Sequence, residues 1–133
     1  MSVLLDTHIW IWWLTSGAPL SDRERDGLDA LAAAGEVWLS AVSLWEAQML
    51  HQKGRLTLPV PFEEWLPQAA GDRVVRVAPL DVDVVLALDR LPASFHGDPA
   101  DRLIVATGRA RRLPLATKDR GIRRSRAVKL WRP

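Results

Sequence analysis

The sequence predicts an α/β fold, a three-layer α/β/α sandwich built around a central parallel sheet. Short apolar runs of strand length, such as Val3–Leu5, recur along the chain and alternate with helical patterns. Most of these runs are apolar throughout, as expected for parallel strands covered by helices on both faces. A length of 133 residues fits one domain, 1–133, and lets the chain bury about two-thirds of its unfolded surface.

The chain begins with a strand and two helices. Val3–Leu5 is the first strand, and the apolar, tryptophan-rich residues 7–14 form the first helix. Gly17–Pro19 breaks this helix. Ser21 and Glu24 then have the spacing of a capping box, which predicts a second helix from Ser21 to Gly35.

A second strand and two further helices follow. Residues 37–39 form the strand, and residues 43–53 the next helix. Ser43 and Glu46 again have capping-box spacing, and Gly54 is the expected C-terminal stop. Two prolines separate this helix from one over residues 62–70.

The last part of the chain continues the alternation. Residues 74–77 alternate valine with arginine, like an edge strand, and Asp81 caps a helix that runs to about Leu91. Asp98 followed by Pro99 opens a helix that runs to about Arg112. Residues 113–117 form a strand, and residues 128–131 are a candidate for one more.

Charge is divided unevenly along the chain. Residues 1–101 have a balance of −8 and residues 102–133 a balance of +10, which together give the net +2. A basic tail on an acidic body predicts a phosphate-rich or acidic partner. From composition alone, a solvated arginine-rich helix face explains the tail equally well.

Several classes of site and location are excluded or made less plausible by composition. The chain has no cysteine, which excludes disulfides and thiolate metal sites. No apolar run approaches the ~20 residues of a membrane span. Asp6 falls where a signal peptide would need a basic or apolar segment, so we expect a cytoplasmic protein without membrane contact.

Acidic residues recur at positions that meet in such a fold. The carboxyl ends of parallel strands share one edge of the sheet, where ligands bind. Asp6 and Asp119 follow predicted strands, Asp98 and Asp101 open a helix, and Glu46 lies in the expected first turn of another. Crowded carboxylates repel one another unless a cation lies among them. Oxygen ligands of this kind suit Mg²⁺ or Mn²⁺, which activate water and neutralise phosphoryl oxygens in phosphodiester hydrolysis.

Each acid also has a structural explanation. Asp6 and Asp98 are candidate helix caps, and Glu46 is a candidate capping-box partner of Ser43. Asp101 suits the first turn of a helix, where the dipole favours an acid, and Asp119 suits a turn. The argument for a metal site therefore rests on their joint placement.

Four ordered segments resemble the motifs of PIN domains of the VapC type. They are Leu4–His8 with Trp12–Leu14, Leu39–Glu46, His96–Arg102 and Ala116–Asp119. The match extends over nearly the whole chain, and four motifs in order are far more specific than one. Gly97 departs from the pattern, since a larger residue is common there.

The resemblance implies the PIN fold, which is Rossmann-like, and a Mg²⁺- or Mn²⁺-dependent endoribonuclease that is the toxin of a toxin–antitoxin pair. The family's acidic set falls on Asp6, Glu46, Asp101 and Asp119. Asp6 and Asp101 would be the principal metal ligands, while Glu46 and Asp119 position water or a second cation. Asp98 is a metal ligand or a cap. Hydrolysis would leave a 5′-phosphate.

The resemblance also implies a homodimer and an antitoxin that covers an apolar groove. Helices carrying Trp12, Trp45 and Trp65 are candidates for that groove.

Other side chains have supporting roles in this hypothesis. Thr117 would hydrogen-bond a ligand carboxylate or a phosphate, although a buried strand-end hydroxyl explains it nearly as well. His96 is a candidate supporting group, although an ordinary packed or capping histidine is the commoner case. The expected RNA-binding residues are basic and lie near the proposed site in sequence: Arg102, Lys118, Arg120, Arg123 and Arg124.

Two other functions compete with this one. A PIN-like module that binds RNA or protein without cutting needs no acidic set, so the intact set argues against it. A nucleotide phosphatase or a dinucleotide-binding protein would be expected to carry a glycine-rich phosphate loop, and the sequence has none.

Overall fold

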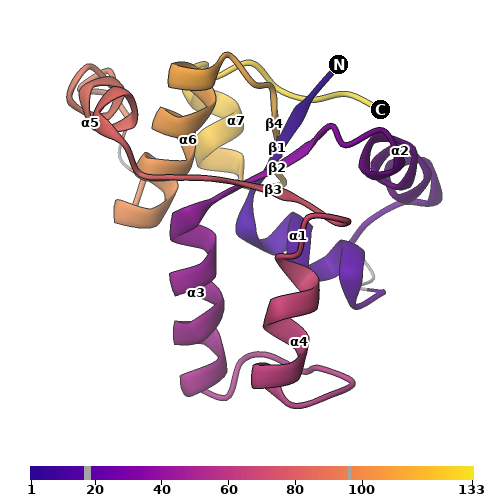
Figure 1. The fold of residues 1–133 in the computed structure, drawn as a ribbon. Coiled ribbons are helices and arrows are strands. Elements are labelled where there is room, and N and C mark those ends of the chain that lie inside the picture. The colour runs from indigo at the N-terminus through magenta and orange to yellow at the C-terminus, as the bar shows by residue number, and fades with distance from the viewer. Residues whose placement is uncertain (17–18, 96) are drawn as a thin grey trace.

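The sheet is parallel, as predicted, and it has four strands in the described part of the chain. The computed structural model describes residues 1–16, 19–95 and 97–133. The strand order is β3-β2-β1-β4, with β1 at Val3–Leu5, β2 at Val37–Ser40, β3 at Arg76–Ala78 and β4 at Leu115–Ala116. The helices are α1 Thr7–Leu14, α2 Asp22–Ala33, α3 Ala41–Gln52, α4 Phe62–Ala69, α5 Val82–Asp89, α6 Pro99–Arg111 and α7 Arg120–Ser125 (Figure 1).

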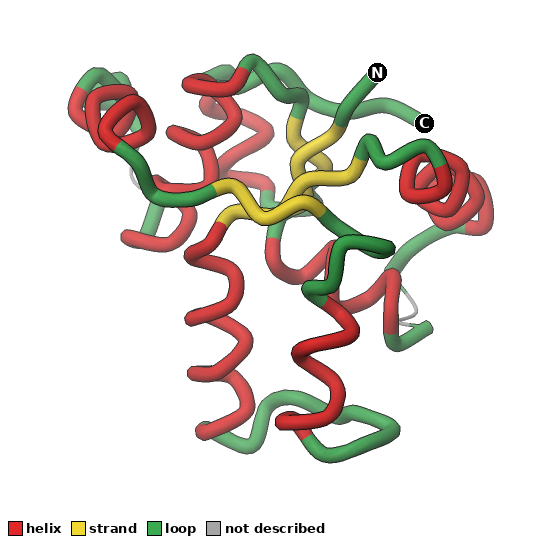
Figure 2. The backbone as a smooth tube through the Cα atoms, viewed as in Figure 1, coloured by secondary structure: helices red, strands yellow, loops and turns green. Residues whose placement is uncertain are grey.

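Both faces of the sheet are covered, which confirms the three-layer architecture. Successive strand residues point to opposite faces, so Val3 and Leu5 join a core with α1, α2 and α4. Leu4, between them, joins a second core with α6 and the C-terminal segment. Figure 2 shows the strands lying between these two groups of helices.

Four predicted helix starts are confirmed by their caps. Asp6, Asp81 and Asp98 each accept a hydrogen bond from a backbone N–H of the helix that follows. Ser21 and Glu24 form a complete capping box. These caps fix where each chain segment turns from the sheet or a loop into a helix.

The predicted start of the third helix is wrong. α3 begins at Ala41, and its cap is Ser40, whose hydroxyl accepts from the N–H of Val42. Because β2 passes directly into α3, Ser43 is a buried helix residue and Glu46 lies in the second turn rather than the first. A Ser43–Glu46 capping box therefore does not form.

The remaining differences lie in short elements. β3 begins two residues later than predicted, because residues 72–74 form a turn. The expected strand 113–117 is reduced to two residues, and the expected strand 128–131 to a single parallel bridge between Leu115 and Leu130. α7 was not predicted at all.

α3 and α4 extend together away from the sheet (Figure 1). Trp65 of α4 is buried, with 6% of its surface exposed, and its ring lies 5.2 Å from that of Trp10. It is therefore a core residue, which contradicts its predicted place in an open groove. Trp45 of α3 is 51% exposed. Among the helices that the structure describes, none has the length and apolarity needed to cross a membrane.

Candidate active site

Five acidic side chains line one cavity of about 360 Å³ at the carboxyl edge of the sheet. They are Asp6, Glu46, Asp98, Asp101 and Asp119. They come from the end of β1, from α3, from the start of α6 and from the loop after β4, so residues far apart in the sequence meet here. We call this cavity the acidic pocket; His8, Trp12 and Lys118 complete its lining.

Asp6 is the most buried of these acids, with 6% of its surface exposed. Its Oδ1 accepts from the N–H of Thr7 at 2.8 Å, and its Oδ2 accepts from the Thr117 hydroxyl at 2.7 Å. The Thr117 hydroxyl in turn accepts from the N–H of Asp119 at 3.0 Å. Burial raises the pKa of Asp6, against the lowering effect of these hydrogen bonds. The predicted contact of Thr117 with a site carboxylate is present, and Asp6 caps α1 at the same time.

Glu46 is held by the buried hydroxyl of Thr7, which is itself hydrogen-bonded to the hydroxyl of Ser43. Thr7 donates its hydroxyl hydrogen to Glu46, and the oxygens of Thr7 and Ser43 lie 2.7 Å apart. Burial raises the pKa of Glu46, and the hydrogen bond from Thr7 partly offsets this. Thr7 therefore contacts two acids, Asp6 through its backbone and Glu46 through its side chain.

Asp98 and Asp101 lie one helical turn apart at the start of α6. Asp98 is exposed and caps the helix, accepting from the N–H of Asp101 at 2.8 Å. The pKa of Asp101 is raised to about 7, first by burial and then by the negative charges of Asp98, Asp6, Asp119 and Glu46. All four other acids of the pocket thus act on Asp101.

Gly97 precedes this helix and leaves no room for a larger residue. A Cβ atom there would lie 2.5 Å from the Phe95 ring and 2.9 Å from the Cβ of Asp101. The departure from the family pattern at this position therefore matches the local packing.

Asp119 caps α7 by accepting from the N–H of Ile122 at 2.9 Å. The side chain is exposed on the rim of the acidic pocket. Its structural role is that of a helix cap, where the sequence indicated a turn.

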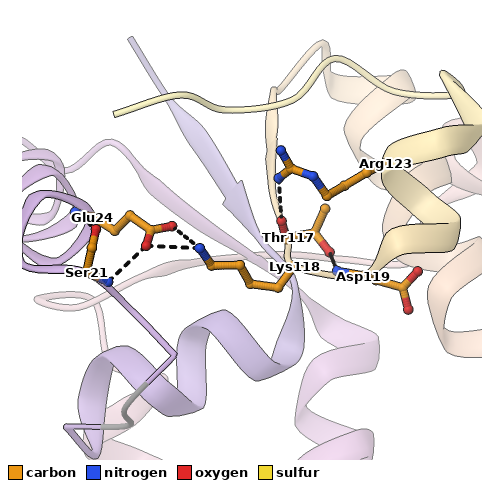
Figure 3. A network of polar contacts seen from close by, with 6 residues as sticks. All are labelled: Ser21, Glu24, Thr117, Lys118, Asp119 and Arg123. Atoms are coloured by element: carbon orange, nitrogen blue, oxygen red, sulfur yellow. Dashed lines mark hydrogen bonds and ion pairs between the residues drawn. The ribbon is translucent and has the colours of Figure 1, made fainter.

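Lys118 is paired with an acid of α2. Its Nζ lies 2.8 Å and 3.0 Å from the two carboxylate oxygens of Glu24, which also accepts from the N–H of Ser21 (Figure 3). Burial acts to raise the pKa of Glu24, but the hydrogen bonds to Lys118 and Ser21 outweigh it, so the pKa is lowered. The pair ties the loop that carries Asp119 to the start of α2.

The other predicted RNA-binding residues lie around the site rather than in the acidic pocket. Arg102 donates to the carbonyl of Phe95 and Arg123 to that of Thr117, each at 3.1 Å. Arg124 lines an adjoining cavity of about 610 Å³, which shares Asp98, Asp101 and Asp119 with the acidic pocket. Arg120 is exposed at the start of α7. His96 lies outside the described residues.

Sequence reasoning missed the roles of three side chains at this site. Thr7 holds Glu46, Ser43 hydrogen-bonds Thr7, and Glu24 holds Lys118. The three-residue spacing of Ser43 and Glu46 is compatible with two arrangements. Residues at this spacing share one helix face, and the same spacing is also typical of a capping box. Glu24 is 94 residues from Lys118, and no local pattern could link the two.

The donor set fits a hard divalent cation. The acidic pocket offers carboxylate oxygens, the ligands that Mg²⁺ and Mn²⁺ prefer. Within the described ranges, no three acidic or histidine side chains are close enough to form a ready-made metal cage. Mg²⁺ commonly takes one or two carboxylates and keeps several waters, so the pocket suits a partly hydrated ion.

Comparison with known proteins identifies the family. The PIN domain profile matches residues 3–127. The chain is 37% identical to Ribonuclease VapC22 of Mycobacterium tuberculosis (strain ATCC 25618 / H37Rv), over 98% of each chain. In fold it is similar to a chain of VapBC2 from Rickettsia felis bound to a promoter DNA fragment (TM-score 0.71, 17% identity, 98% of each chain). It is also similar to a chain of FitAcB from Neisseria gonorrhoeae (TM-score 0.66, 22% identity, 98% of this chain and 96% of that one). The predicted resemblance is confirmed: the chain belongs to the PIN domain family and is related to its VapC proteins.

Proposed function

We propose that this protein is a Mg²⁺-dependent endoribonuclease and the toxin of a toxin–antitoxin pair. The observation that carries the proposal is the gathering of five acids, from four parts of the chain, around one pocket, where the other four act on Asp101. A 37% identical relative named as a ribonuclease supports the same reaction. Mn²⁺ is the expected substitute for Mg²⁺.

Asp6 and Asp101 are the proposed principal metal ligands, with Asp98 and Asp119 at the rim as further candidates. The bound ion would lower the pKa of water and neutralise the charge that develops on the phosphoryl oxygens. Asp6 is fixed on both oxygens by Thr7 and Thr117, so its position costs little to organise when an ion arrives.

The remaining residues act on water and on the RNA. Glu46, which accepts a hydrogen bond from Thr7, would position the attacking water or a second cation. Asp119, which lines the same pocket, would likewise position water or a second cation. Lys118 and Arg124, at the pocket and the adjoining cavity, would bind phosphates of the strand.

An antitoxin is the proposed protein partner. The similarity in fold to chains of VapBC2 and FitAcB supports such a partner. Trp12 lines the acidic pocket, and Trp45, one residue before Glu46, is 51% exposed. A protein segment that covered Trp12 would also cover the acids that line the same pocket, and Trp45 would offer it a further apolar contact. A homodimer and a cytoplasmic location remain part of the proposal.

The test is RNA cleavage by Asp6→Asn and Asp101→Asn variants. Each removes one negative charge at nearly constant volume, so we expect at least a 100-fold loss of cleavage, the scale of losing a major electrostatic contribution, with the fold retained. Sequencing of RNA ends after brief expression of each form would give the cut sites. Asp72→Asn, an exposed acid outside the pocket, is the matched control.

Retained cleavage in either pocket variant would contradict the proposed site. RNA binding without cleavage by the unaltered chain, with Mg²⁺ or Mn²⁺ present, would favour the alternative of a non-cleaving binding module.

A further inference from the structure

A second cavity, of about 580 Å³, lies at the opposite edge of the sheet and is lined by basic side chains. We call it the basic pocket. Leu113 and Pro114, which precede β4, place it at the amino end of that strand. Its six basic residues are Arg109, Arg112, Arg123, Arg126, Lys129 and Arg132, and no acidic residue lines it.

The charge of the basic pocket is not neutralised by acids of the described chain. Among the described residues, the two ion pairs are formed by Arg111 with Asp81 and by Lys118 with Glu24. Neither Arg111 nor Lys118 lines the basic pocket. Arg109 and Arg123 donate to the backbone carbonyls of Ala127 and Thr117. These contacts fix the two guanidinium groups in place without cancelling their charge. All six basic residues of the pocket are exposed.

Two of these arginines occupy backbone positions that favour glycine. Arg112 follows α6 with φ 55°, and Arg126 follows α7 with φ 54°. A left-handed conformation at a helix end is usually taken by glycine or asparagine, because other side chains are strained there. Of the three described non-glycine residues with positive φ, Ser16, Arg112 and Arg126, the two arginines line the same cavity. The presence of arginine at both helix ends, where glycine is favoured, indicates that the positive charge of the basic pocket has a function.

α7 connects the two pockets. Its cap, Asp119, lines the acidic pocket, and its C-terminal cap, Arg126, lines the basic pocket. A helix of six residues is only about 9 Å long. In Figure 1 the strand β4 and α7 lie side by side, with the C-terminal segment passing above them. A strand bound in the acidic pocket therefore needs to cross only one short helix to reach the basic pocket.

An aromatic side chain adjoins the basic pocket. A neighbouring cavity of about 770 Å³ shares Arg112, Lys129 and Arg132 with it and is also lined by Trp131. Arginine forks match phosphate geometry, and tryptophan offers a surface on which a base can stack. This combination suits a nucleic acid strand better than an acidic peptide.

We propose that the basic pocket binds phosphates of the RNA strand beyond the bond that is cut, on the far side of α7 from the acids. The identity of the strand rests on the proposed function. The binding itself does not depend on cleavage, since the acids and the proposed metal site lie in the other pocket.

The test is RNA binding by the double variant Arg112→Asn, Arg126→Asn. Asparagine tolerates the left-handed conformation, so the variant removes two charges while its melting temperature should stay the same or rise. Binding of a labelled single-stranded RNA of about 20 nucleotides would be followed by fluorescence anisotropy at several salt concentrations. All proteins would carry Asp6→Asn and be kept in EDTA to prevent cleavage.

We expect at least a tenfold loss of affinity at about 0.1 M salt. The slope of log affinity against log salt should fall by about 1.4, which is two phosphate contacts at about 0.7 each for single strands. The matched control is Arg55→Asn, Arg73→Asn, which removes the same charge from exposed positions outside both pockets. It should change the affinity about twofold at most.

Equal losses in the pocket and control variants would overturn the proposal, because they would reveal a general effect of net charge. Unchanged RNA affinity together with lost binding of a polyglutamate probe would also overturn it, in favour of an acidic protein segment. If the unaltered chain binds RNA through the pocket but does not cut it with Mg²⁺, the proposed function fails and the binding site stands.

Discussion

At the residue scale, Thr7 joins the two acids that come from different elements. Its N–H bonds Asp6 at the end of β1, and its hydroxyl bonds Glu46 on α3. Both Thr7 and Ser43 are fully buried, so their polar atoms depend on one another for hydrogen bonds. The geometry of the acidic pocket therefore depends on a residue that no metal or substrate needs to touch.

We predict that Thr7→Val raises the pH at which cleavage reaches half its maximum. The hydrogen bond from Thr7 lowers the pKa of Glu46, and valine removes it while keeping the volume and the backbone contact with Asp6. The Ser43 hydroxyl loses its partner as well, so stability should fall by about 1–3 kcal/mol. A pH–rate profile and a thermal melt measure the two effects.

Thr7→Ser is the control for this prediction, because it keeps the hydroxyl, and it should restore the profile of the unaltered chain. An unchanged half-maximal pH in Thr7→Val would show that Glu46 does not need to be ionised for cleavage.

The gathering of the acids at one edge could be predicted, and so could the contact of Thr117, but the supporting roles of Thr7, Ser43 and Glu24 could not. Asp6 and Asp119 follow predicted strands, and the rules of parallel sheets bring such positions to one edge. Ser43 was assigned wrongly because Ser40 and Ser43 both precede an apolar run. The extended backbone of Ser40 in β2, with φ −67° and ψ 141°, decides between them, and it is a property of the sheet rather than of local sequence.

At the element scale, α7 shows why short helices escape prediction. It contains Gly121 and three arginines, and Ile122 is its one buried residue. The Asp119 cap and the burial of Ile122 against the second core hold it in place. A six-residue helix is too short to be stable by propensity alone, so its existence depends on tertiary contacts. Tertiary contacts also explain why β3 starts later than predicted. Val75 is buried like a strand residue, although it lies in the loop before β3.

We predict that Gly108→Ala destabilises the fold even though alanine favours helices. A Cβ at Gly108, inside α6, would lie 2.9 Å from Cγ2 of Val128 and 3.2 Å from the carbonyl oxygen of Leu113. The overpacking cost, about 1–3 kcal/mol, exceeds the gain in propensity of up to about 1 kcal/mol. We expect a net loss of about 1 kcal/mol in the free energy of unfolding, measured by urea denaturation.

The double variant Gly108→Ala, Val128→Ala tests the cause of this loss. Val128→Ala removes the nearer of the two clashing groups. The double variant should therefore lose less free energy of unfolding than the sum of the losses in the two single variants. Additive losses would mean that the contact with Val128 is not responsible.

At the scale of the whole molecule, the fold separates acidic and basic residues between two edges of the sheet. Acids line the pocket at the carboxyl edge, and basic residues of the C-terminal part of the chain line the pocket at the opposite edge. The sequence predicts the acidic body and the basic tail. It does not predict that α7 carries the tail from the acidic pocket to the opposite edge, because that course follows from the position of an unpredicted helix. The crowding of acids at one edge has a cost for the whole molecule, since like charges there oppose folding.

We predict that the metal-free protein becomes less stable as the pH rises from about 4 to about 8. The folded-state pKa values of Asp6, Glu46 and Asp101 are all raised, that of Asp101 to about 7. Because the folded state holds these protons more tightly than the unfolded state, the favourable contribution is complete below about pH 4 and is lost as the pH passes 7.

The size of this effect follows from Asp101. Its side chain is partly exposed, so solvent screening reduces the contribution to about 1–2 kcal/mol, or a few degrees in melting temperature. Asp101→Asn should therefore melt higher than the unaltered chain at pH 8 and nearly equally at pH 4. Asp72→Asn, remote from the pocket, should keep the full pH dependence.

Mg²⁺ should reverse the loss at pH 8, because it binds the ionised acids and not their protonated forms. At pH 5, where part of the pocket is protonated, the same Mg²⁺ concentration should raise the melting temperature less. In Asp101→Asn the Mg²⁺ effect should be small at both pH values, since a proposed ligand is missing. If Mg²⁺ stabilises Asp101→Asn as much as the unaltered chain at pH 8, the ion binds elsewhere, and the acidic pocket is not its site.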